Sequence, residues 1–253
     1  MHLLWGPLGP EPAASFGAAY RAVDPGVEHR LVALYNGFDG DEAEVRDALA
    51  VTPDQEIHTE RPVQDLVAYR RALDVVSCDR VVFLNSWSEP LVDGWLAALA
   101  GALDDPGVGI AGCTGSWESP ASEAPPHLKL HRMLLFERFP NPHVRTNAFA
   151  LRAELGRSLQ WEVRRRKVGA ESLESGKRGL TRQVIERGLR PVVVSRRGVV
   201  EVEDWPEARV YRSARQEQLL VADNRTRQYA EADPRRRAVL ARMVWRDRAL
   251  PDT

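Results

Sequence analysis

The chain has 253 residues, of which 43% are hydrophobic and 28% are charged, and its formal net charge at pH 7 is -1. This composition is typical of a globular protein, and the length suffices for one large α/β domain or two small ones. The balanced charge gives no global attraction to nucleic acid, so we expect no nucleic-acid partner. No run approaches the roughly 18 apolar residues that cross a bilayer, and no basic region precedes a long apolar run at the N-terminus. We therefore expect a cytoplasmic protein without a transmembrane segment.

The cysteines and histidines do not predict a metal centre or a disulfide framework. Cys78 and Cys113 are the only cysteines, and no CxxC or Cys/His cluster is present. His127 and His131 have the i, i+4 spacing of a helical pair, but they lack the carboxylate of an HExxH arrangement. Ordinary packing or surface roles are favoured for all four residues.

Strands and helices alternate along the first 115 residues. Short apolar runs that end in polar or glycine-containing turns predict strands, and apolar residues at helical spacing predict helices. The predicted strands are 2–5, 30–35, 57–59, 81–84 and 108–111, and the predicted helices are 13–23, 42–50 (with Asp41 as its N-cap), 65–76 and 94–103. This βαβ spacing predicts an α/β fold, with a mainly parallel central sheet and helices on both faces.

The stretch RVVFLNSWSEPL, residues 80–91, marks the centre of the predicted sheet. A buried strand ends there in the polar turn 85–89. In an open α/β sheet, ligands bind beyond the carboxyl ends of the strands. We therefore expect the functional site at this turn, although Asn and Ser are also ordinary turn residues.

The second half of the chain has fewer regular patterns. A loop rich in Ser, Pro and Glu covers residues 115–126, and a loop of that length after a strand is often functional. The further predicted elements are helices at 127–138, 152–159, 180–187 and 231–246, and strands at 144–151 and 191–195.

This order of segments resembles the GT-A fold glycosyltransferases of the large family 2 type, which move a sugar from a nucleotide diphosphate. The matching pieces are the Asn36-Gly37 loop, the helix that starts at Asp65, the turn FLNSWSEP with the Trp95 helix, PGVGIAG, RTNAFALR and ESLESGKRGLTRQVIERGLRPVVV. The tail DWPEARVYRSARQEQLLVADNRT looks like that of bacterial hypothetical glycosyltransferases. The resemblance implies a GT-A-like nucleotide-sugar-binding and catalytic core at residues 1–200, with residues 201–253 as a C-terminal extension packed on it.

The resemblance also implies a donor site. The residues that it places near the nucleotide sugar are Gly6, Asn36, Gly37, Asp65, Asn85 and Ser88. Asp65 either accepts a hydrogen bond from the base or ribose or caps its own helix. Gly37 allows a positive φ or a close approach of the backbone.

The metal motif of such enzymes is degenerate in this chain. Their Asp-x-Asp holds a divalent cation against the donor diphosphate, whereas the corresponding triplet here is Trp87-Ser88-Glu89. Only Glu89 remains as a ligand for Mg or Mn. The alternatives are a metal-free site, in which Arg225 or Arg227 contacts the diphosphate, or a chain that has lost catalysis.

The catalytic base of inverting members corresponds to the segment 171–176. Glu174 is favoured over Glu171, because its distance to Gly188 fits the family better. It would take the proton from an acceptor hydroxyl, and the alternative is a helix cap or a salt bridge with Lys177 or Arg178. Trp117 and Trp205 either stack on an acceptor sugar or pack within their own loops.

We therefore expect a bacterial glycosyltransferase that moves a sugar, with inversion, from a nucleotide diphosphate sugar to a glycan or lipid-linked acceptor in cell-surface polysaccharide biosynthesis. The alternative is a catalytically silent nucleotide-sugar or glycan-binding protein on the same fold. A glycoside hydrolase that uses Glu118 and Glu174 is a third reading. Peripheral membrane contact would come from the basic runs Arg164–Lys167 or Arg235–Arg237.

Overall fold

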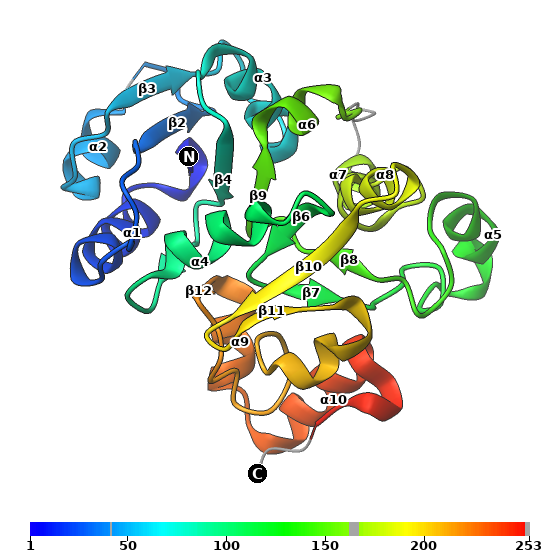
Figure 1. Ribbon diagram of the computed structural model, residues 1–253. Coiled ribbons are helices and arrows are strands. Elements are labelled where there is room, and N and C mark those ends of the chain that lie inside the picture. The colour runs from blue at the N-terminus through cyan, green and yellow to red at the C-terminus, as the bar shows by residue number, and fades with distance from the viewer. Residues whose placement is uncertain (41, 162–166, 251–253) are drawn as a thin grey trace.

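The computed structural model describes residues 1–40, 42–161 and 167–250, and it is built on an eight-stranded sheet (Figure 1). Asp41 and Arg164–Arg166, on which two expectations rested, lie outside the described residues. The strand order is β11 (Gly198–Val200), β10 (Arg190–Ser195), β6 (Val108–Gly112), β9 (Ala148–Arg152), β4 (Arg80–Leu84), β1 (His2–Trp5), β2 (Val32–Asn36) and β3 (Gln55–His58). All of these strands run in one direction except β9 and β11. The expected α/β class with a mainly parallel sheet is confirmed.

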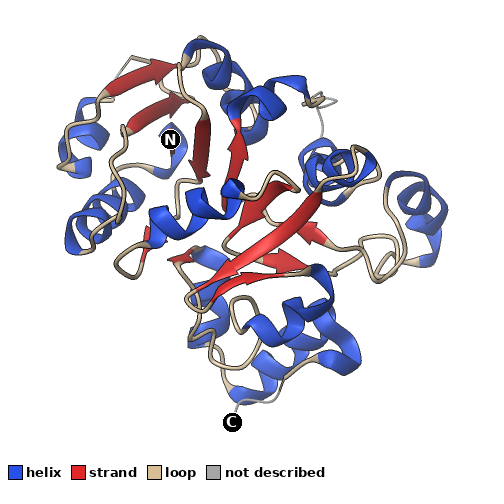
Figure 2. Cartoon of the chain, viewed as in Figure 1, coloured by secondary structure: helices blue, strands red, loops and turns tan. Residues whose placement is uncertain are grey.

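Helices cover both faces of the sheet, as Figure 2 shows by secondary structure. Along β4, Val82 and Leu84 belong to one apolar cluster, whereas Val81 and Phe83 belong to the other, because successive strand side chains point to opposite faces. The first cluster includes residues of α1 (Glu11–Ala22), α2 (Ala43–Leu49) and α4 (Trp95–Gly101). The second includes residues of α3 (Asp65–Val75), α6 (Ala153–Ser158), α7 (Lys167–Ser175) and α8 (Leu180–Glu186).

The single strand expected at 144–151 is two strands. β8 (His143–Val144) pairs with β7 (Gly115–Ser116), and β9 inserts antiparallel between β4 and β6. The strand is interrupted at residues 145–147, because the polar run Arg-Thr-Asn breaks the apolar pattern, and these residues connect β8 to β9. This break places residues 145–147 beside the turn that follows β4, where Asn85 N donates to the carbonyl of Asn147 at 2.9 Å.

The turn after β4 is joined to the C-terminal part of the chain. β5 (Glu89–Pro90) pairs antiparallel with β12 (Val221–Ala222). Glu89 therefore lies in a strand, whereas the sequence predicted an open turn at this position. Trp205 of the helical turn η3 (Val202–Ala208) and Trp245 are buried in the same cluster as Phe83. The division of the chain at residue 200 stays a prediction, although these contacts show that the segment after it packs on the sheet domain.

Three predicted helices have different bounds. The helix expected at 231–246 is α10 (Pro234–Trp245), which begins after Asp233, because Asp233 caps it by accepting from Arg236 N at 2.9 Å. The helix before it, α9 (Asn224–Glu231), was not predicted. The helix expected at 127–138 is α5 (Pro126–Leu135), and α4 ends in the helical turn η2 (Ala102–Asp104). The remaining short helical turns are η1 (Gly6–Leu8) and η4 (Arg246–Arg248). Within the described residues, no helix combines the length and the apolar character that spanning a membrane requires.

Candidate functional site

The loops after β1 and β2 pack tightly against each other at the carboxyl edge of the sheet. A Cβ atom on Gly6 would lie 2.4 Å from the carbonyl oxygen of Gly37, and one on Gly37 would lie 2.7 Å from the Trp5 ring. Gly37 also has a φ of 78°, which L side chains rarely adopt. Both glycines are therefore required by the backbone geometry that shapes this edge.

Asn36 holds the next loop in place. Its fully buried side chain accepts hydrogen bonds from Thr59 Oγ1 at 2.9 Å and Val63 N at 3.1 Å, and it donates to the carbonyl of Val63 at 2.8 Å. Asp65 follows on α3, where Gln64 occupies the N-cap position and Asp65 lies exposed in the first turn. The capping alternative for Asp65 is therefore wrong. Burial raises the pKa of its carboxyl group, and a ligand role for this side chain stays a prediction.

The polar side chains of the central turn shape the turn itself. Asn85 Oδ1 accepts from Trp87 N and from Ser88 Oγ, both at 3.0 Å. Ser88 Oγ also lies 2.9 Å from the carbonyl oxygen of Asn147, and the residue is fully buried. The turn therefore presents a fixed backbone at the end of β4, and Ser88 cannot reach a ligand from this position.

The connection between β8 and β9 brings Glu174 to this turn. Thr146 N donates to Glu174 Oε1 at 2.9 Å, while the carbonyl oxygen of the adjacent Asn147 accepts from Asn85 N at 2.9 Å. Asn147 is buried, its Oδ1 accepts from Thr114 Oγ1 at 2.7 Å, and its Nδ2 has no hydrogen-bond partner among the described residues. A buried amide donor without a protein partner is uncommon.

A buried ion pair borders the same connection. Arg145 Nη2 lies 3.0 Å from Asp223 Oδ2, and the guanidinium stacks 4.1 Å from the centre of the Tyr211 ring. Burial alone would raise the pKa of the Asp223 carboxyl, but the charge of Arg145 and the hydrogen bonds from Thr226 outweigh it, so the pKa is lowered. Burial would lower the pKa of Arg145, but Asp223 raises it above its ordinary value. Both groups therefore stay charged.

Arg227 of α9 reaches the central turn. Its Nη1 lies 2.7 Å from Glu89 Oε1 and 3.4 Å from the carbonyl oxygen of Trp87, with both side chains partly exposed. Arg225 is exposed on the same helix, and no contact joins it to the turn. Of the two arginines considered from the sequence, Arg227 is the one that contacts residues 85–89.

The residues of the turn do not fit a divalent cation. Such an ion takes oxygen ligands, and Mg²⁺ is bound by one or two carboxylates together with phosphates and waters. The turn supplies one carboxylate, Glu89, which is paired with Arg227, and the amide oxygen of Asn85 already accepts two hydrogen bonds. In the described part of the chain, no group of three or more His, Cys, Asp or Glu residues is arranged to hold a metal. We therefore assign no step to Mg or Mn.

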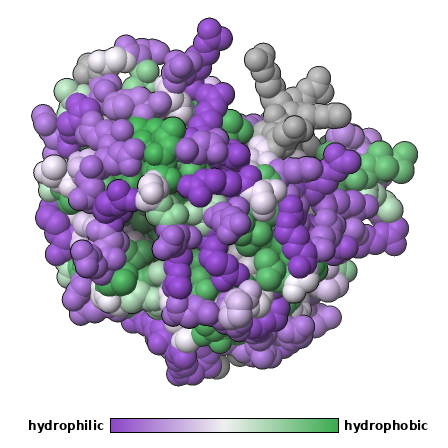
Figure 3. Space-filling view, turned by 45° about the horizontal axis from the view of Figure 1, so that its top comes forward, coloured by the Kyte–Doolittle hydropathy of each residue, from purple (hydrophilic) through white to green (hydrophobic). Residues whose placement is uncertain are grey.

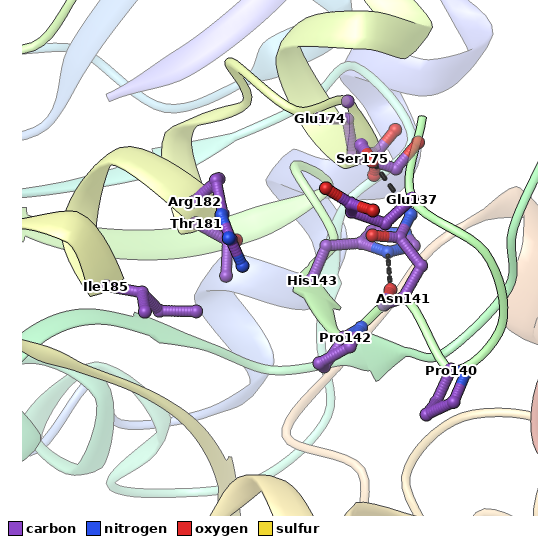
Figure 4. A pocket seen from close by; sticks show the side chains of 11 residues that line it. Glu137, Pro140, Asn141, Pro142, His143, Glu174, Ser175, Thr181, Arg182 and Ile185 are labelled. Atoms are coloured by element: carbon purple, nitrogen blue, oxygen red, sulfur yellow. Dashed lines mark hydrogen bonds between the residues drawn. The ribbon is translucent and has the colours of Figure 1, made fainter. Parts of the chain in front are cut away.

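Glu174 also lines a small cavity with His143, shown in Figure 4. The cavity of about 70 Å³ has room for a few water molecules, since one water needs roughly 10–15 Å³ on this measure. His143 Nδ1 donates to the carbonyl of Asn141 at 2.8 Å, which leaves Nε2 as an acceptor in the neutral ring. Burial lowers the pKa of His143, against the opposing charge of Glu174, so the ring is neutral at pH 7.

The two glutamates of α7 lie in different surroundings. Glu171 forms an ion pair with Arg132 of α5 and does not line the cavity. Among the described residues no ion pair joins Glu174 to Lys177 or Arg178, and Lys177 Nζ donates to the carbonyl of Met133 at 2.9 Å. The geometry therefore favours Glu174 over Glu171 as the carboxylate of the site.

The two tryptophans considered as sugar platforms are packed inside the protein. Trp205 is 1% exposed, it donates from Nε1 to the carbonyl of Val200, and its ring covers Gly115. Trp117 is 9% exposed and meets the Trp245 ring edge to face at 5.7 Å. Neither ring offers a free face for stacking in this arrangement, so the packing alternative describes both.

Four further residues of the site were not predicted from the sequence, namely Arg145, Asn147, Asp223 and His143. The polar run within an apolar segment at 145–147 was a usable signal. Asp223 had a second one, because the spacing Asp-x-x-Thr before a helix is a capping pattern, and Asp223 and Thr226 do cap α9 reciprocally. No local signal pairs Asp223 with Arg145, which lies 78 residues earlier.

No protein-family model and no curated protein matches the chain, but several solved structures do. Glucosyl-3-phosphoglycerate synthase from Mycobacterium tuberculosis, in complex with Mn2+, uridine diphosphate and glucosyl-3-phosphoglycerate, is 20% identical over 60% of this chain and 56% of that chain, with a TM-score of 0.38. The WbbM bifunctional glycosyltransferase is 15% identical over 61% and 31%, with a TM-score of 0.37. HddC from Yersinia pseudotuberculosis is 13% identical over 62% and 77%, with a TM-score of 0.38.

The chain spans little more than half the length of glucosyl-3-phosphoglycerate synthase. At these identities and TM-scores, no residue role and no ligand passes from those proteins to this one.

Proposed function

We propose that the protein transfers a glycosyl group from a nucleotide diphosphate sugar to a hydroxyl acceptor, with inversion. The observation that carries the proposal is the connection 145–147, which fixes Glu174 on one side and the turn after β4 on the other. Two segments that are separated by more than 80 residues thus place a carboxylate next to the expected ligand edge of a parallel sheet. A general base must lie within reach of the reacting atoms, and this arrangement supplies one.

The nucleotide would lie over the close-packed glycine loops at Gly6 and Gly37, with the exposed carboxylate of Asp65 near the base or ribose. The diphosphate would then lie at the turn 85–89. Arg227 would leave Glu89 and place its guanidinium against the phosphate oxygens, because a planar cation with paired donors suits phosphate geometry. This charge would stabilise the leaving group where a metal ion does so in enzymes with Asp-x-Asp.

In the chemical step, the acceptor oxygen attacks the anomeric carbon and the bond from that carbon to the diphosphate oxygen breaks. Glu174 takes the proton of the acceptor hydroxyl, and the nucleoside diphosphate leaves with the electron pair of the broken bond. The hydrogen bond from Thr146 N to Oε1 fixes the carboxylate and leaves Oε2 to accept the proton. Displacement from the opposite face gives inversion.

The setting that we propose follows the sequence resemblance alone. It is bacterial polysaccharide assembly in the cytoplasm, with a glycan or lipid-linked acceptor.

Replacement of Glu174 by Gln tests the proposal. Release of nucleoside diphosphate would be measured for a panel of nucleotide sugars, with donor affinity measured by calorimetry. We expect turnover by Glu174→Gln to fall about 10²- to 10⁴-fold, as the loss of a general base does, with donor affinity within twofold of the original. Glu154→Gln, an exposed carboxylate of α6, is the matched control and should keep full turnover.

Two results would contradict the proposal. Donor binding without turnover, for every sugar and with or without manganese, would identify a silent nucleotide-sugar-binding protein. A loss of turnover in Glu171→Gln but not in Glu174→Gln would move the base to the other carboxylate of α7.

A further inference from the structure

Helix α5 projects from the body of the protein with an uncovered apolar stripe. None of its residues is buried, and Figure 1 shows it at the right-hand edge, away from the sheet. Leu130 is 75% exposed and Leu134 is 69% exposed, which are the highest values among the exposed large hydrophobic residues. Hydrophobic residues protrude at the same edge in Figure 3.

The stripe follows the geometry of the helix. Residues three and four apart share a helix face, so Leu130 and Leu134 stand together with His127 and His131 on the outer side. The inner side is attached through Lys177, whose backbone N donates to the carbonyl of Leu135 at 2.9 Å and whose Nζ donates to that of Met133. Because the opposite side of α5 is attached to the rest of the protein, the two leucines point outward.

Cations surround this stripe. Lys129, Arg138 and Arg178 are exposed, and in the part of the chain that the structure describes none of them has an ion-pair partner. Of the nearby acids, Glu171 is already paired with Arg132 of α5 and Glu123 lies 3.9 Å from Arg246, which leaves Glu137, partly exposed next to Arg138, against the three cations. The surface that faces outward is therefore apolar at its centre and positively charged at its rim.

We propose that this face of α5 docks on an anionic lipid bilayer. A helix with an apolar side and a basic rim lies in the membrane interface, with the apolar side chains among the acyl chains and the cations at the headgroups. A second copy of the chain fits less well, because a two-fold interface brings each patch against itself and would oppose like charges. The positive charge of the rim therefore favours binding to a negatively charged surface. The exposed leucines favour a surface with an apolar interior.

The docked orientation also concerns the candidate site, and this step rests on the proposed function. A shallow hollow beside α5 is lined by Met133, Phe139, Lys177 and other residues. It shares Glu137, Pro140 and Arg182 with the cavity that contains Glu174. Docking through α5 would therefore turn the Glu174 side of the protein toward the membrane, where an acceptor carried on an anionic lipid would be held.

Vesicle flotation tests the docking without any donor or acceptor. The full chain would be mixed with phosphatidylcholine vesicles that contain or lack phosphatidylglycerol. We expect binding to the anionic vesicles that weakens as salt is added, and at least tenfold weaker binding for Leu130→Ser/Leu134→Ser. The control is Val75→Ser/Val199→Ser, which replaces two exposed apolar residues outside α5 and should bind like the original chain. Arg138→Ser/Arg178→Ser should weaken binding to anionic vesicles only.

The proposal is overturned if the chain does not bind anionic vesicles, if it binds neutral ones equally well, or if the leucine variant binds as the original does. Sedimentation equilibrium supplies a further outcome, since a dimer that the leucine substitutions dissociate would make a second copy the occupant. Circular dichroism checks that every variant is folded. Because no nucleotide sugar is present, a failure here leaves the proposed transfer reaction untouched, and the loss of transfer activity would leave the docking untouched.

Discussion

At the scale of single residues, the central question is what neutralises a diphosphate at the turn after β4. The turn offers one carboxylate, Glu89, and a guanidinium lies 2.7 Å from it. An ion pair with both members partly exposed contributes little to stability, typically about 0–1 kcal/mol. Arg227 can therefore exchange Glu89 for a phosphate at small cost, which is why we assign it to anion binding and not to a structural role.

Substitutions at the two members of this pair should have opposite effects on nucleoside diphosphate affinity. Arg227→Met should weaken binding about tenfold or more, which corresponds to roughly 1.4 kcal/mol. Glu89→Gln should strengthen it, because the guanidinium loses its competing partner. Calorimetric titration of uridine and guanosine diphosphates measures both, with Arg71→Met on α3 as the charge-matched control. A metal role for Glu89 predicts the reverse, namely a manganese-dependent loss of affinity in Glu89→Gln.

At the scale of elements, helix α9 depends on a residue that serves two purposes. Asp223 caps the helix, since its Oδ1 accepts from Thr226 N at 2.7 Å, and its Oδ2 pairs with Arg145. Because β12 immediately precedes this cap and pairs with β5, the position of Arg227 follows from Asp223. The ion pair thus links the connection 145–147 to the helix that supplies the guanidinium.

Asp223→Asn separates these two purposes. The amide oxygen can still cap α9, but Arg145 loses its buried counter-charge, so we expect a loss of about 3 kcal/mol in the free energy of unfolding. Thr226→Ala removes half of the reciprocal cap and keeps the charge, and it should cost about 1 kcal/mol. Urea denaturation followed by tryptophan fluorescence measures both. Equal losses in the two variants would mean that the ion pair adds nothing beyond the cap.

Elements that carry their own signal were predictable from the sequence, and elements that depend on a distant partner were not. β1, β2, β4, β6 and β10 were found because buried strands read as short apolar runs. The antiparallel direction of β9 was not, because it depends on insertion between β4 and β6. The two-residue strands β5 and β12 have no pattern of their own and form only as a pair.

The same distinction applies to the site. The turn at 85–89 was selected because it follows a buried strand, and Glu174 was selected through the family resemblance. In the structure, both contact the connection 145–147. Asn36, Asn85 and Ser88 were expected to face a ligand, but their hydrogen bonds are used within the fold, and a single sequence gives the residue type without its partner. Trp117 and Trp205 show the same limit, since a tryptophan in a loop can cover its own loop as readily as a sugar.

At the scale of the whole molecule, the stability of the fold depends on pH through a buried histidine at the sheet. His2 is 1% exposed on β1, and its ring stacks on Phe16 with the centres 3.7 Å apart. Burial lowers its pKa from 6.5 to about 3. Between these values the unfolded chain binds a proton that the folded chain excludes, so the contribution of His2 is complete above pH 6.5 and is lost as the pH falls toward 3.

His2→Phe should therefore flatten the acid side of the stability curve. The phenyl ring keeps the stack on Phe16 but has no proton to bind, so the slope of unfolding free energy between pH 6 and pH 4 should fall by up to about 1.4 kcal/mol per pH unit. Urea denaturation of both proteins at several values of pH measures the two slopes, and the other titrating groups cancel in their difference. Because slopes are compared, a constant change in stability caused by the substitution does not affect the test. Equal slopes would show that His2 is protonated in the folded protein, and that the ring is less well buried than its packing between β1 and α1 requires.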